Sequence, residues 1–419
     1  MNITLHQSSI QKQSSIKITG SKSESNRLLL LQALYPEFKI ENVSNSDDSM
    51  LMEKALRSSS DVIDINHAGT AMRFLTAYFS IQEGREVTLT GSKRMKERPI
   101  KILVDALQNL GAEISYIKNE GYPPIKIKGK KLTKNKVSLK ANVSSQYISA
   151  LLLIASKLEN GLELSLEGEI TSVPYIKMTL SLLDEIGIGT SFIDNVIIVK
   201  PNTKNLKPKI LTVESDWSSA SYYFSIAAIS KVGTEITLSS YKENSLQGDS
   251  DLVNIYKHFG VTSTFKAHSI TLKKESNVLT RFEYNLVNAP DIAQTIAVTC
   301  FALGIACDLT GLHTLKIKET DRLVALKTEI EKLGGKVDIT DKSLHLKSNT
   351  LFNLDSELSS SPLEGLSEAV ATYHDHRMAM AFAPLALKTT IVIEDAEVVS
   401  KSYPAFWDDL KPIGFQITK

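Results

Sequence analysis

The strongest constraint on the fold is one segment design that occurs four times along the chain. Each copy has an apolar pattern of helical period, then a glycine, then a strand-like alternation: LVDALQNLGAEISYI, TLSLLDEIGIGTSFI, LVNIYKHFGVTSTFK and LKTEIEKLGGKVDIT. Their glycines are 76, 73 and 74 residues apart, at Gly111, Gly187, Gly260 and Gly334. This spacing indicates an internally duplicated α/β unit. The period would fit the 419 residues between five and six times, so we expect repeated α/β units grouped into two lobes.

A second series of six segments predicts helices that are buried on every side. Each opens with polar or charged residues and then is apolar all round: SESNRLLLLQAL, HAGTAMRFLTAYF, SSQYISALLLIA, DWSSASYYFSIAAI, PDIAQTIAVTCFALG and DHRMAMAFAPLAL. The polar starts of buried helices need a reason. Either each start is capped separately by its own Ser, Thr or Asp, or the six starts meet and combine their positive dipole ends into one anion site.

Basic residues stand at or near these expected helix starts. In KETDRLVAL, Lys318 and Arg322 stand at the start of a further helix, with Lys316 just before. Thr320 or Asp321 can cap that helix, and the Gly334–Gly335 pair can end it. Cations are mildly unfavourable at a helix N-terminus. A solvated basic turn is the ordinary explanation, and a pocket for a multiply charged anion is the alternative; its lining would include Lys22, Arg27, Arg73, Arg98, Arg322 and Arg377.

Composition describes an ordinary globular chain of two or three domains. Hydrophobic residues make up 42%, charged residues 23%, and the formal charge is +1, so affinity for nucleic acid through bulk charge is not expected. Cys300 and Cys307 lie in an apolar run typical of a core, which fits a reducing compartment. Without a signal core or an apolar stretch of membrane-spanning length, we expect a cytoplasmic protein.

Ten motifs, in order from about residue 20 to residue 407, resemble one known family. They are GSKSESNRLLLLQAL, HAGTAMRFL, KERPI, SSQYISALLL, SVPYIKMTL, NSLQGD, PDIAQTIA, KETDRL, DHRMAMAF and SKSYPAFW. The chain resembles the 5-enolpyruvylshikimate-3-phosphate synthases, also called 3-phosphoshikimate 1-carboxyvinyltransferases. The resemblance implies a two-lobed inverse α/β barrel, in which each lobe has three βαβαββ units and buried helices whose N-termini face the interlobe cleft. It places residues 1–20 with 215–419 in one lobe and residues 21–214 in the other.

The resemblance also implies the reaction. The family moves the carboxyvinyl group of phosphoenolpyruvate onto the 5-hydroxyl of shikimate 3-phosphate and releases phosphate, on the shikimate pathway to chorismate and the aromatic amino acids. Glyphosate occupies the phosphoenolpyruvate site in this family. The resemblance implies no metal and no organic cofactor, and we expect a monomer that binds these two small molecules, and neither nucleic acid nor a membrane.

Matching motif positions assign the site residues by resemblance. The implied catalytic residues are Asp291 as the base on the 5-hydroxyl, with Glu319 or Lys22 as the proton donor to the methylene carbon; the sequence leaves that choice open. The implied contacts of shikimate 3-phosphate are Lys22, Ser23, Arg27, Ser144, Ser145, Gln146, Ser172, Tyr175, Asp291, Thr314 and Lys318. The implied contacts of phosphoenolpyruvate are Lys22, His67, Gly69, Arg98, Gln146, Arg322, His376, Arg377 and Lys401.

Two positions depart from the family pattern, and two other functions compete. His67 and Thr314 stand where many or some members have asparagine, which bears on substrate affinity and inhibitor sensitivity. The related transferase acting on UDP-N-acetylglucosamine commonly uses a cysteine of its first lobe, whereas this chain has none before Cys300. A non-catalytic repeat protein has no use for so costly a group of charges in a cleft. A metal site at His374 and His376 is not expected, because residues two apart do not share a helix face.

Overall fold

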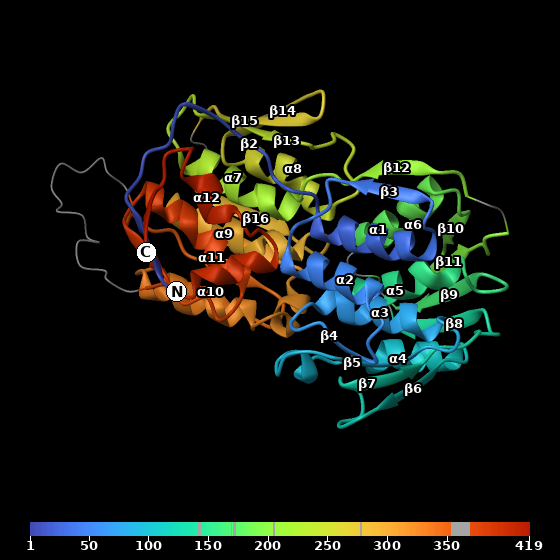
Figure 1. The fold of residues 1–419 in the computed structure, drawn as a ribbon. Coiled ribbons are helices and arrows are strands. Elements are labelled where there is room, and N and C mark those ends of the chain that lie inside the picture. The colour runs from blue at the N-terminus through green and yellow to red at the C-terminus, as the bar shows by residue number, and fades with distance from the viewer. Residues whose placement is uncertain (141–143, 169, 171–172, 204–205, 277–278, 353–368) are drawn as a thin grey trace. The chain divides into compact units, whose positions relative to one another are not determined.

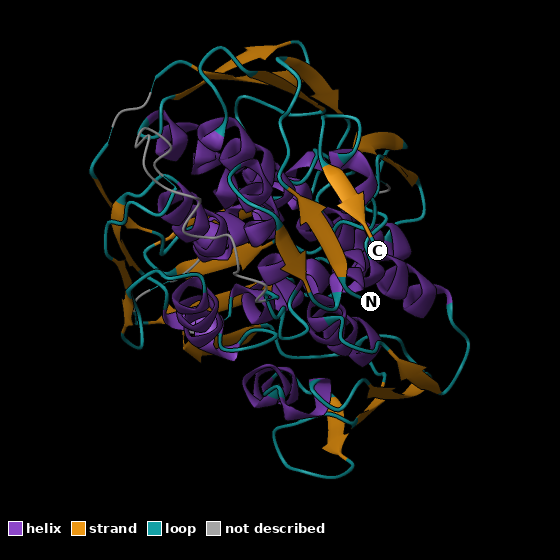
Figure 2. Ribbon diagram, turned by 90° about the vertical axis from the view of Figure 1, so that its left-hand side faces the viewer, coloured by secondary structure: helices purple, strands orange, loops and turns teal. Residues whose placement is uncertain are grey.

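The computed structural model describes residues 1–419 except 141–143, 169, 171–172, 204–205, 277–278 and 353–368. The chain forms two compact units: unit 1 is Met1–Thr19 with Ser215–Lys419, and unit 2 is Gly20–Glu214. Both chain ends belong to unit 1, where strand β1 (Ile3–His6) pairs antiparallel with β20 (Ile391–Ile393) and β21 (Gln416–Thr418). Figure 2 looks onto this unit and shows strands beside both termini, in front of helices.

Four sheets share one topology, two in each unit. In unit 2 their orders are β4 (Val62–Asp64), β5 (Glu86–Thr90), β7 (Ile125–Lys128), β6 (Glu113–Tyr116), and β10 (Thr190–Ile193), β11 (Val196–Val199), β9 (Leu162–Glu167), β8 (Lys136–Lys140). In unit 1 they are β14 (Val261–Lys266), β15 (Ser269–Lys274), β13 (Glu235–Ser239), β2 (Gln13–Ile16), and β16 (Arg281–Asn285), β17 (Ala306–Thr310), β19 (Leu344–Leu346), β18 (Val337–Ile339). Each sheet has one parallel pair, namely β4–β5, β8–β9, β2–β13 or β16–β17, and two antiparallel pairs. One of these sheets, with β4, β5, β6 and β7, lies at the lower edge of Figure 1.

Two helices follow the parallel strands of each sheet and complete the βαβαββ unit. They are α3 (Gly69–Ser80) with α4 (Lys101–Asn109), α5 (Ser145–Ala155) with α6 (Val173–Glu185), α7 (Trp217–Ile229) with α8 (Leu252–Lys257), and α9 (Ala293–Ala302) with α10 (Arg322–Lys332). The expected repeat is confirmed in these four copies. The third copy in each unit has fewer strands: the antiparallel sheet β20–β1–β21 with α11 (His376–Phe382) and α12 (Phe406–Leu410), and the parallel pair β12 (Lys209–Thr212) and β3 (Phe38–Glu41) with α1 (Lys22–Leu34) and α2 (Asp47–Arg57).

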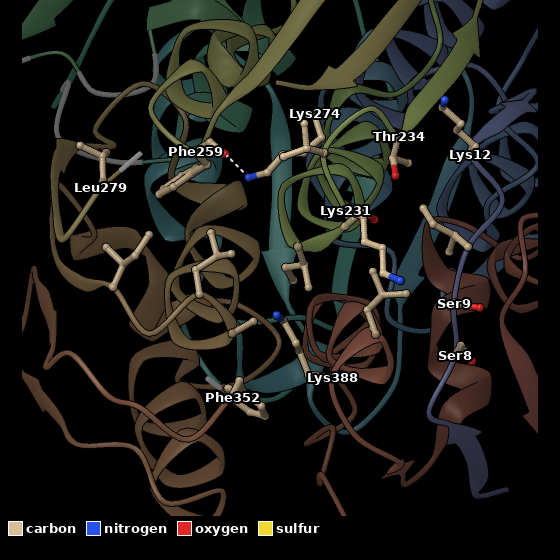
Figure 3. A pocket seen from close by; sticks show the side chains of 18 of the residues that line it. Ser8, Ser9, Lys12, Lys231, Thr234, Phe259, Lys274, Leu279, Phe352 and Lys388 are labelled. Carbon is tan, nitrogen blue, oxygen red and sulfur yellow. Dashed lines mark hydrogen bonds between the residues drawn. The ribbon is translucent and has the colours of Figure 1, made fainter. Parts of the chain in front are cut away.

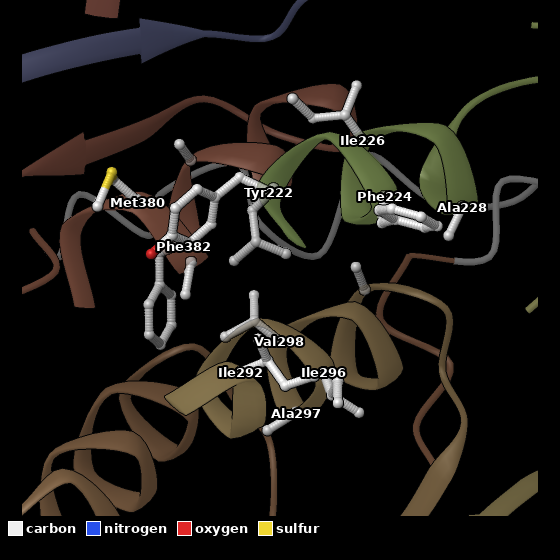
Figure 4. Packing of buried hydrophobic residues seen from close by; sticks show 14 of the residues in the cluster. Tyr222, Phe224, Ile226, Ala228, Ile292, Ile296, Ala297, Val298, Met380 and Phe382 are labelled. Atoms are coloured by element: carbon white, nitrogen blue, oxygen red, sulfur yellow. The ribbon is translucent and has the colours of Figure 1, made fainter. Parts of the chain in front are cut away.

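The six apolar segments are helices in the interiors of the two units, as predicted. Helices α3, α9 and α11 are buried at every residue, and α7 at every residue except Ser218. In unit 1, side chains of α7, α9 and α11 fill the space between these helices (Figure 4). Cys300 and Cys307 are buried free thiols of this core. Within the described residues, we find no helix with both the length and the apolar character needed to cross a membrane.

The four repeat glycines follow the second helix of each complete copy, and all have positive φ. Gly260 has φ 73°, and a Cβ there would lie 1.9 Å from the Ser276 carbonyl oxygen. Gly334 occupies the same place in another copy with φ 85°, but its Cβ would meet only the Leu351 side chain, at 3.4 Å. Both positions therefore require a left-handed backbone, but only Gly334 has room for a side chain.

Replacing these two glycines separates the backbone effect from the steric effect. Gly334→Ala should lower the free energy of unfolding by about 1–2 kcal/mol through left-handed backbone strain. Gly260→Ala should lower it by a further 1–3 kcal/mol, roughly, because the methyl group overlaps backbone. Urea unfolding of the whole chain measures both. Equal losses in the two variants would contradict the steric part of this explanation.

Candidate functional site

In unit 1, Arg377 joins the starts of three buried helices. It is the second residue of α11, and its Nη2 donates to Ser218 Oγ at 3.2 Å, at the start of α7. The same nitrogen lies 3.3 Å from Asp291 Oδ2. Asp291 belongs to the 3₁₀ turn η3 (Pro290–Ile292), which leads directly into α9. The predicted meeting of helix starts is therefore confirmed for the three helices of this unit.

Arg322 is a fully buried cation held by three carboxylates. Its Nε and Nη2 donate to Asp375 at 2.7 and 3.3 Å. Its Nη1 donates to Asp291 at 2.9 Å and its Nη2 to Glu319 at 2.8 Å. Burial alone would lower the pKa of Arg322, but the carboxylates outweigh it and raise the pKa above its ordinary value. Asp321 caps α10, accepting from the Leu323 and Val324 amides.

Asp291 lies among three cations. Besides the two arginines, Lys318 Nζ lies 3.2 Å from its Oδ1. Burial would raise the pKa of this carboxyl, but Lys318, Arg377 and Arg322 together hold the pKa well below its ordinary value. Asp291 is therefore ionised at neutral pH in this arrangement, and it is a weak base as long as all three cations remain beside it.

The remaining unit 1 candidates lie at different depths. Lys401, at the end of η6 (Ala396–Lys401), lies 2.7 Å from Glu319 Oε1. His376 is 1% exposed, and its Nδ1 lies 3.8 Å from Asp375 Oδ1. Thr314, in η4 (His313–Ile317), has a buried hydroxyl with no hydrogen-bond partner in the described part of the chain. Lys316 instead pairs with Asp341 at 2.6 Å on the surface, so the ordinary explanation holds for that lysine.

Sequence reasoning missed two buried carboxylates of unit 1. Asp375 holds Arg322 and also caps α11 by accepting from the Arg377 amide at 2.9 Å. Asp249, in η2 (Gly248–Asp251), accepts a hydrogen bond from Ser218. Burial raises the pKa of Asp249 to about 6, although Arg377 opposes the shift. The sequence feature that could have indicated Asp375 and Asp249 is their position in the DHRMAMAF and NSLQGD motifs, each at the start of a helix.

In unit 2, Arg27 links α1 to α5 and α6, and Gln146 links the starts of α5 and α3. Arg27 donates to the Ser23 carbonyl at 2.7 Å, to Ser149 Oγ at 2.9 Å and to Thr179 Oγ1 at 2.8 Å. Gln146 Nε2 donates to Thr70 Oγ1 at 3.2 Å. Burial lowers the pKa of Arg27 to about 10, so its guanidinium is still charged at neutral pH.

Arg98 lies against the uncapped start of α3. A Cβ at Gly69 would be 2.5 Å from Arg98 Nη1, so any larger residue would make this guanidinium move from its place. The N-cap residue, Ala68, offers no side-chain hydrogen bond. Within the described part of the chain, Arg98 makes no ion pair. The Arg98 guanidinium and the positive end of α3 therefore lie together, and no carboxylate of the described residues is paired with that guanidinium. This arrangement favours the binding of an anion. Arg73 instead donates to the Gly69 and Pro99 carbonyls at 3.1 Å each.

The other unit 2 candidates lie around these three helix starts. Lys22 begins α1, and its Nζ is 3.8 Å from Asp48, a buried acid that sequence reasoning also missed. Ser144 caps α5, Ser145 is its buried first residue, and the Tyr175 ring centroid lies 6.0 Å from Arg27 Cζ. His67 lies two residues before α3. Ser172 lies outside the described residues.

The two explanations of the polar helix starts each hold in part. Side chains cap four of the six starts: Ser21 for α1, Ser144 for α5, Asp216 for α7 and Asp375 for α11. Helices α3 and α9 have no side-chain cap. Separate capping and a meeting of helix starts therefore coexist within each unit. The expectation that both sets of starts face one cleft stays a prediction.

The two histidines of the YHDHRM stretch have separate surroundings. His374 Nδ1 lies 2.6 Å from Asp395 Oδ2 on the surface, whereas His376 is buried. Among the residues that the structure describes, no group of three or more His, Cys, Asp or Glu side chains is arranged to hold a metal ion.

The chain is similar to proteins of one enzyme family over nearly its whole length. A family model described as EPSP synthase (3-phosphoshikimate 1-carboxyvinyltransferase) matches residues 56–410. A Bacteroides fragilis (strain YCH46) protein named 3-phosphoshikimate 1-carboxyvinyltransferase is 47% identical over 410 residues, covering 97% of each chain. A protein of the same name from Actinobacillus pleuropneumoniae serotype 5b (strain L20) is 34% identical over 430 residues, covering 95% of this chain and 96% of its own.

Two solved structures share the fold. The EPSP synthase from Acinetobacter baumannii has a TM-score of 0.78 at 19% identity, with 100% of both chains covered. The enolpyruvyl transferase NikO from Streptomyces tendae has a TM-score of 0.72 at 13% identity, with 100% of this chain and 98% of that chain covered. These likenesses confirm the two-lobed α/β fold expected from the sequence.

The raised pKa of Asp249 predicts a stability that depends on pH. The folded chain holds this proton up to about pH 6 instead of the ordinary 3.8, so wild-type stability falls as pH rises between these values. Asp249→Asn removes the buried charge and should raise the free energy of unfolding at pH 7.5 by up to about 3 kcal/mol, with no gain at pH 4. Urea unfolding at several pH values measures the difference.

A matched change at the surface controls for the loss of a negative charge. Asp408 is an exposed carboxylate paired with Lys411, so Asp408→Asn should show no such pH-dependent gain. An Asp249→Asn variant that is less stable than the wild type at pH 7.5 would contradict the assignment.

Proposed function

Because this chain belongs to the family of EPSP synthases, we propose that it transfers the carboxyvinyl group of phosphoenolpyruvate to the 5-hydroxyl of shikimate 3-phosphate. The 5-oxygen attacks C2 of the enolpyruvate while C3 gains a proton, which gives a tetrahedral intermediate. Loss of the C3 proton then expels phosphate and leaves the new enol ether. The observation that carries the proposal is the 47% identity, over 97% of both chains, to a relative of that name.

We assign the carboxylate of phosphoenolpyruvate to Arg322 and Arg377. Both guanidiniums approach Asp291, so one small region presents two planar forks that match a carboxylate. Lys401, beside Glu319, is assigned to the phosphate. Thr314 and Lys318 are assigned to shikimate 3-phosphate, Lys318 because it lies with Asp291, the proposed base on the 5-hydroxyl.

The arrangement suggests how substrate binding activates Asp291. A substrate carboxylate that accepts the Arg377 and Arg322 donors weakens their attraction to Asp291 and adds a like charge beside it. Both effects raise the pKa of Asp291 from its strongly lowered value. The residue thus becomes a better proton acceptor when the second substrate is bound, which is the condition that general base catalysis needs.

We assign the phosphate groups mainly to unit 2. Arg98 and the uncapped start of α3 provide positive charge without a paired carboxylate, which suits the phosphate of phosphoenolpyruvate, together with Gln146 and Gly69. Lys22, Arg27 and the Ser144–Ser145 start of α5 are assigned to shikimate 3-phosphate. Their binding energy serves to position two anions that otherwise repel each other.

Glu319 and Lys22 are the proposed groups for the proton on C3. Glu319 shares its two oxygens between Arg322 and Lys401, so a phosphate that takes over Lys401 would make the carboxyl easier to protonate. Lys22, near Asp48, is the alternative donor. We further propose that the protein acts as a cytoplasmic monomer on these two small molecules.

The test measures phosphate release from phosphoenolpyruvate with shikimate 3-phosphate or UDP-N-acetylglucosamine as acceptor. We expect phosphate release with shikimate 3-phosphate as the acceptor and none with UDP-N-acetylglucosamine. Release that depends on UDP-N-acetylglucosamine would contradict the proposed acceptor. In Asp291→Asn, kcat should fall at least about 100-fold while the affinity for shikimate 3-phosphate is kept, since general base catalysis is worth roughly 10²–10⁴. Near-normal turnover would remove Asp291 from its proposed role.

A further inference from the structure

A large cavity opens at the opposite ends of the unit 1 helices, away from the charged cluster. Its volume is about 1080 Å³, and it is lined by the C-terminal ends of α7, α9 and η5 (Ala383–Leu387), at Ile229–Ser230, Ala302–Leu303 and Leu387–Lys388. Helix α9 has 10 residues, which puts about 15 Å between its two ends. The cavity is therefore separate from the site around Asp291.

Four lysines line this cavity, and none of the other described residues that line it is a carboxylate. They are Lys12, Lys231, Lys274 and Lys388. Figure 3 shows Lys274 extending from the right toward the Phe259 carbonyl, with Lys388 below it. Three helix C-termini carry roughly half a negative charge each, or about −1.5 together, so the dipoles neutralise less than half of the charge of four lysines.

Lys274 is the lysine for which burial is most costly. Its side chain is 1% exposed, and its Nζ donates to the Phe259 carbonyl at 2.7 Å. Within the described residues it makes no ion pair. Burial, together with the charge of Lys388, lowers the pKa of Lys274 to about 8. A buried ammonium without a counter-ion is costly, so a function that uses its charge would explain its place.

Unit 2 provides an internal comparison at the same place in its own repeats. A smaller cavity of about 290 Å³ lies at the C-terminal ends of α1, α3 and α5, and it is lined by Lys130, Lys131 and Lys157. Two carboxylates, Glu83 and Glu159, line it as well, and Lys131 pairs with Glu159 at 3.1 Å. In unit 2, carboxylates thus offset part of the lysine charge at the helix ends. The four lysines of the unit 1 cavity are therefore more than the helix ends alone require.

We propose that the unit 1 cavity is a second binding site, for a small organic anion with an apolar body. Its remaining charge of roughly +2.5 suits a carboxylate or phosphate group. Apolar side chains, among them Ile10, Phe259, Leu279, Phe352 and Leu387, line the rest of the cavity and would cover the body of such a ligand. The proposal does not depend on the transferase activity.

The test titrates the whole protein with 8-anilinonaphthalene-1-sulfonate, a fluorescent anion with an aromatic body. The wild type should bind it, and Lys274→Met/Lys388→Met should lose at least about tenfold in affinity. The matched control is Lys130→Met/Lys157→Met in the unit 2 cavity, which should bind like the wild type. Phosphate release in the transferase assay should be the same in all three proteins.

Competition separates the parts of the proposed ligand. Benzoate should displace the probe at concentrations at least about tenfold below those of inorganic phosphate, because only benzoate has an apolar body. Equal potency of phosphate, or equal probe affinity in the wild type and Lys274→Met/Lys388→Met, would overturn the proposal. Circular dichroism checks that the double variant is folded. If the double variant is not folded, the single variant Lys388→Met, at a half-buried position, replaces it, and a probe affinity equal to that of the wild type again overturns the proposal.

Discussion

The meeting of three buried helix N-termini in each unit is the constraint on which the rest of the structure depends. Helices that are apolar all round can be satisfied only inside a unit, and the repeated βαβαββ topology brings them together there. The positive ends of these helices therefore lie close together, and an arginine adds a further positive charge there, Arg377 in unit 1 and Arg98 in unit 2. The cost of gathering like charges must be offset by carboxylates of the chain or by an anionic ligand.

The two units solve this problem differently, and the difference fits a reaction between two anions. In unit 1, Asp291, Glu319 and Asp375 already hold Arg322, so a ligand must compete with the chain's own carboxylates. That competition links ligand binding to the proton affinity of the carboxylates. In unit 2, Arg98 has no ion pair within the described residues, so an anion can bind there without displacing one. Unit 1 is thus suited to proton transfer and unit 2 to holding phosphate groups.

Sequence patterns predicted the features that local periodicity determines. The helix–glycine–strand design, the six buried helices and a cap at Thr320 or Asp321, which the structure places at Asp321, all follow from residues close together in the chain. The partner of Arg322 does not, because Asp375 lies 53 residues further along and meets it only through the packing of α10 against α11. Asp48 and Asp249 were missed for the same reason. The third copy in each unit has fewer strands, and in unit 1 its sheet combines strands from both ends of the chain, β1 with β20 and β21, which periodicity does not reveal.

The central claim is that the positive helix starts bind anions. Thermal unfolding with phosphoenolpyruvate tests this claim at Arg98, where the chain's own carboxylates neutralise the positive charge least. A ligand that binds the folded chain raises Tm in proportion to the logarithm of its concentration. The wild type and Arg94→Met, which alters an exposed arginine paired with Glu97, should show this rise. Arg98→Met should lose most of it. An undiminished rise of Tm in Arg98→Met would contradict the claim.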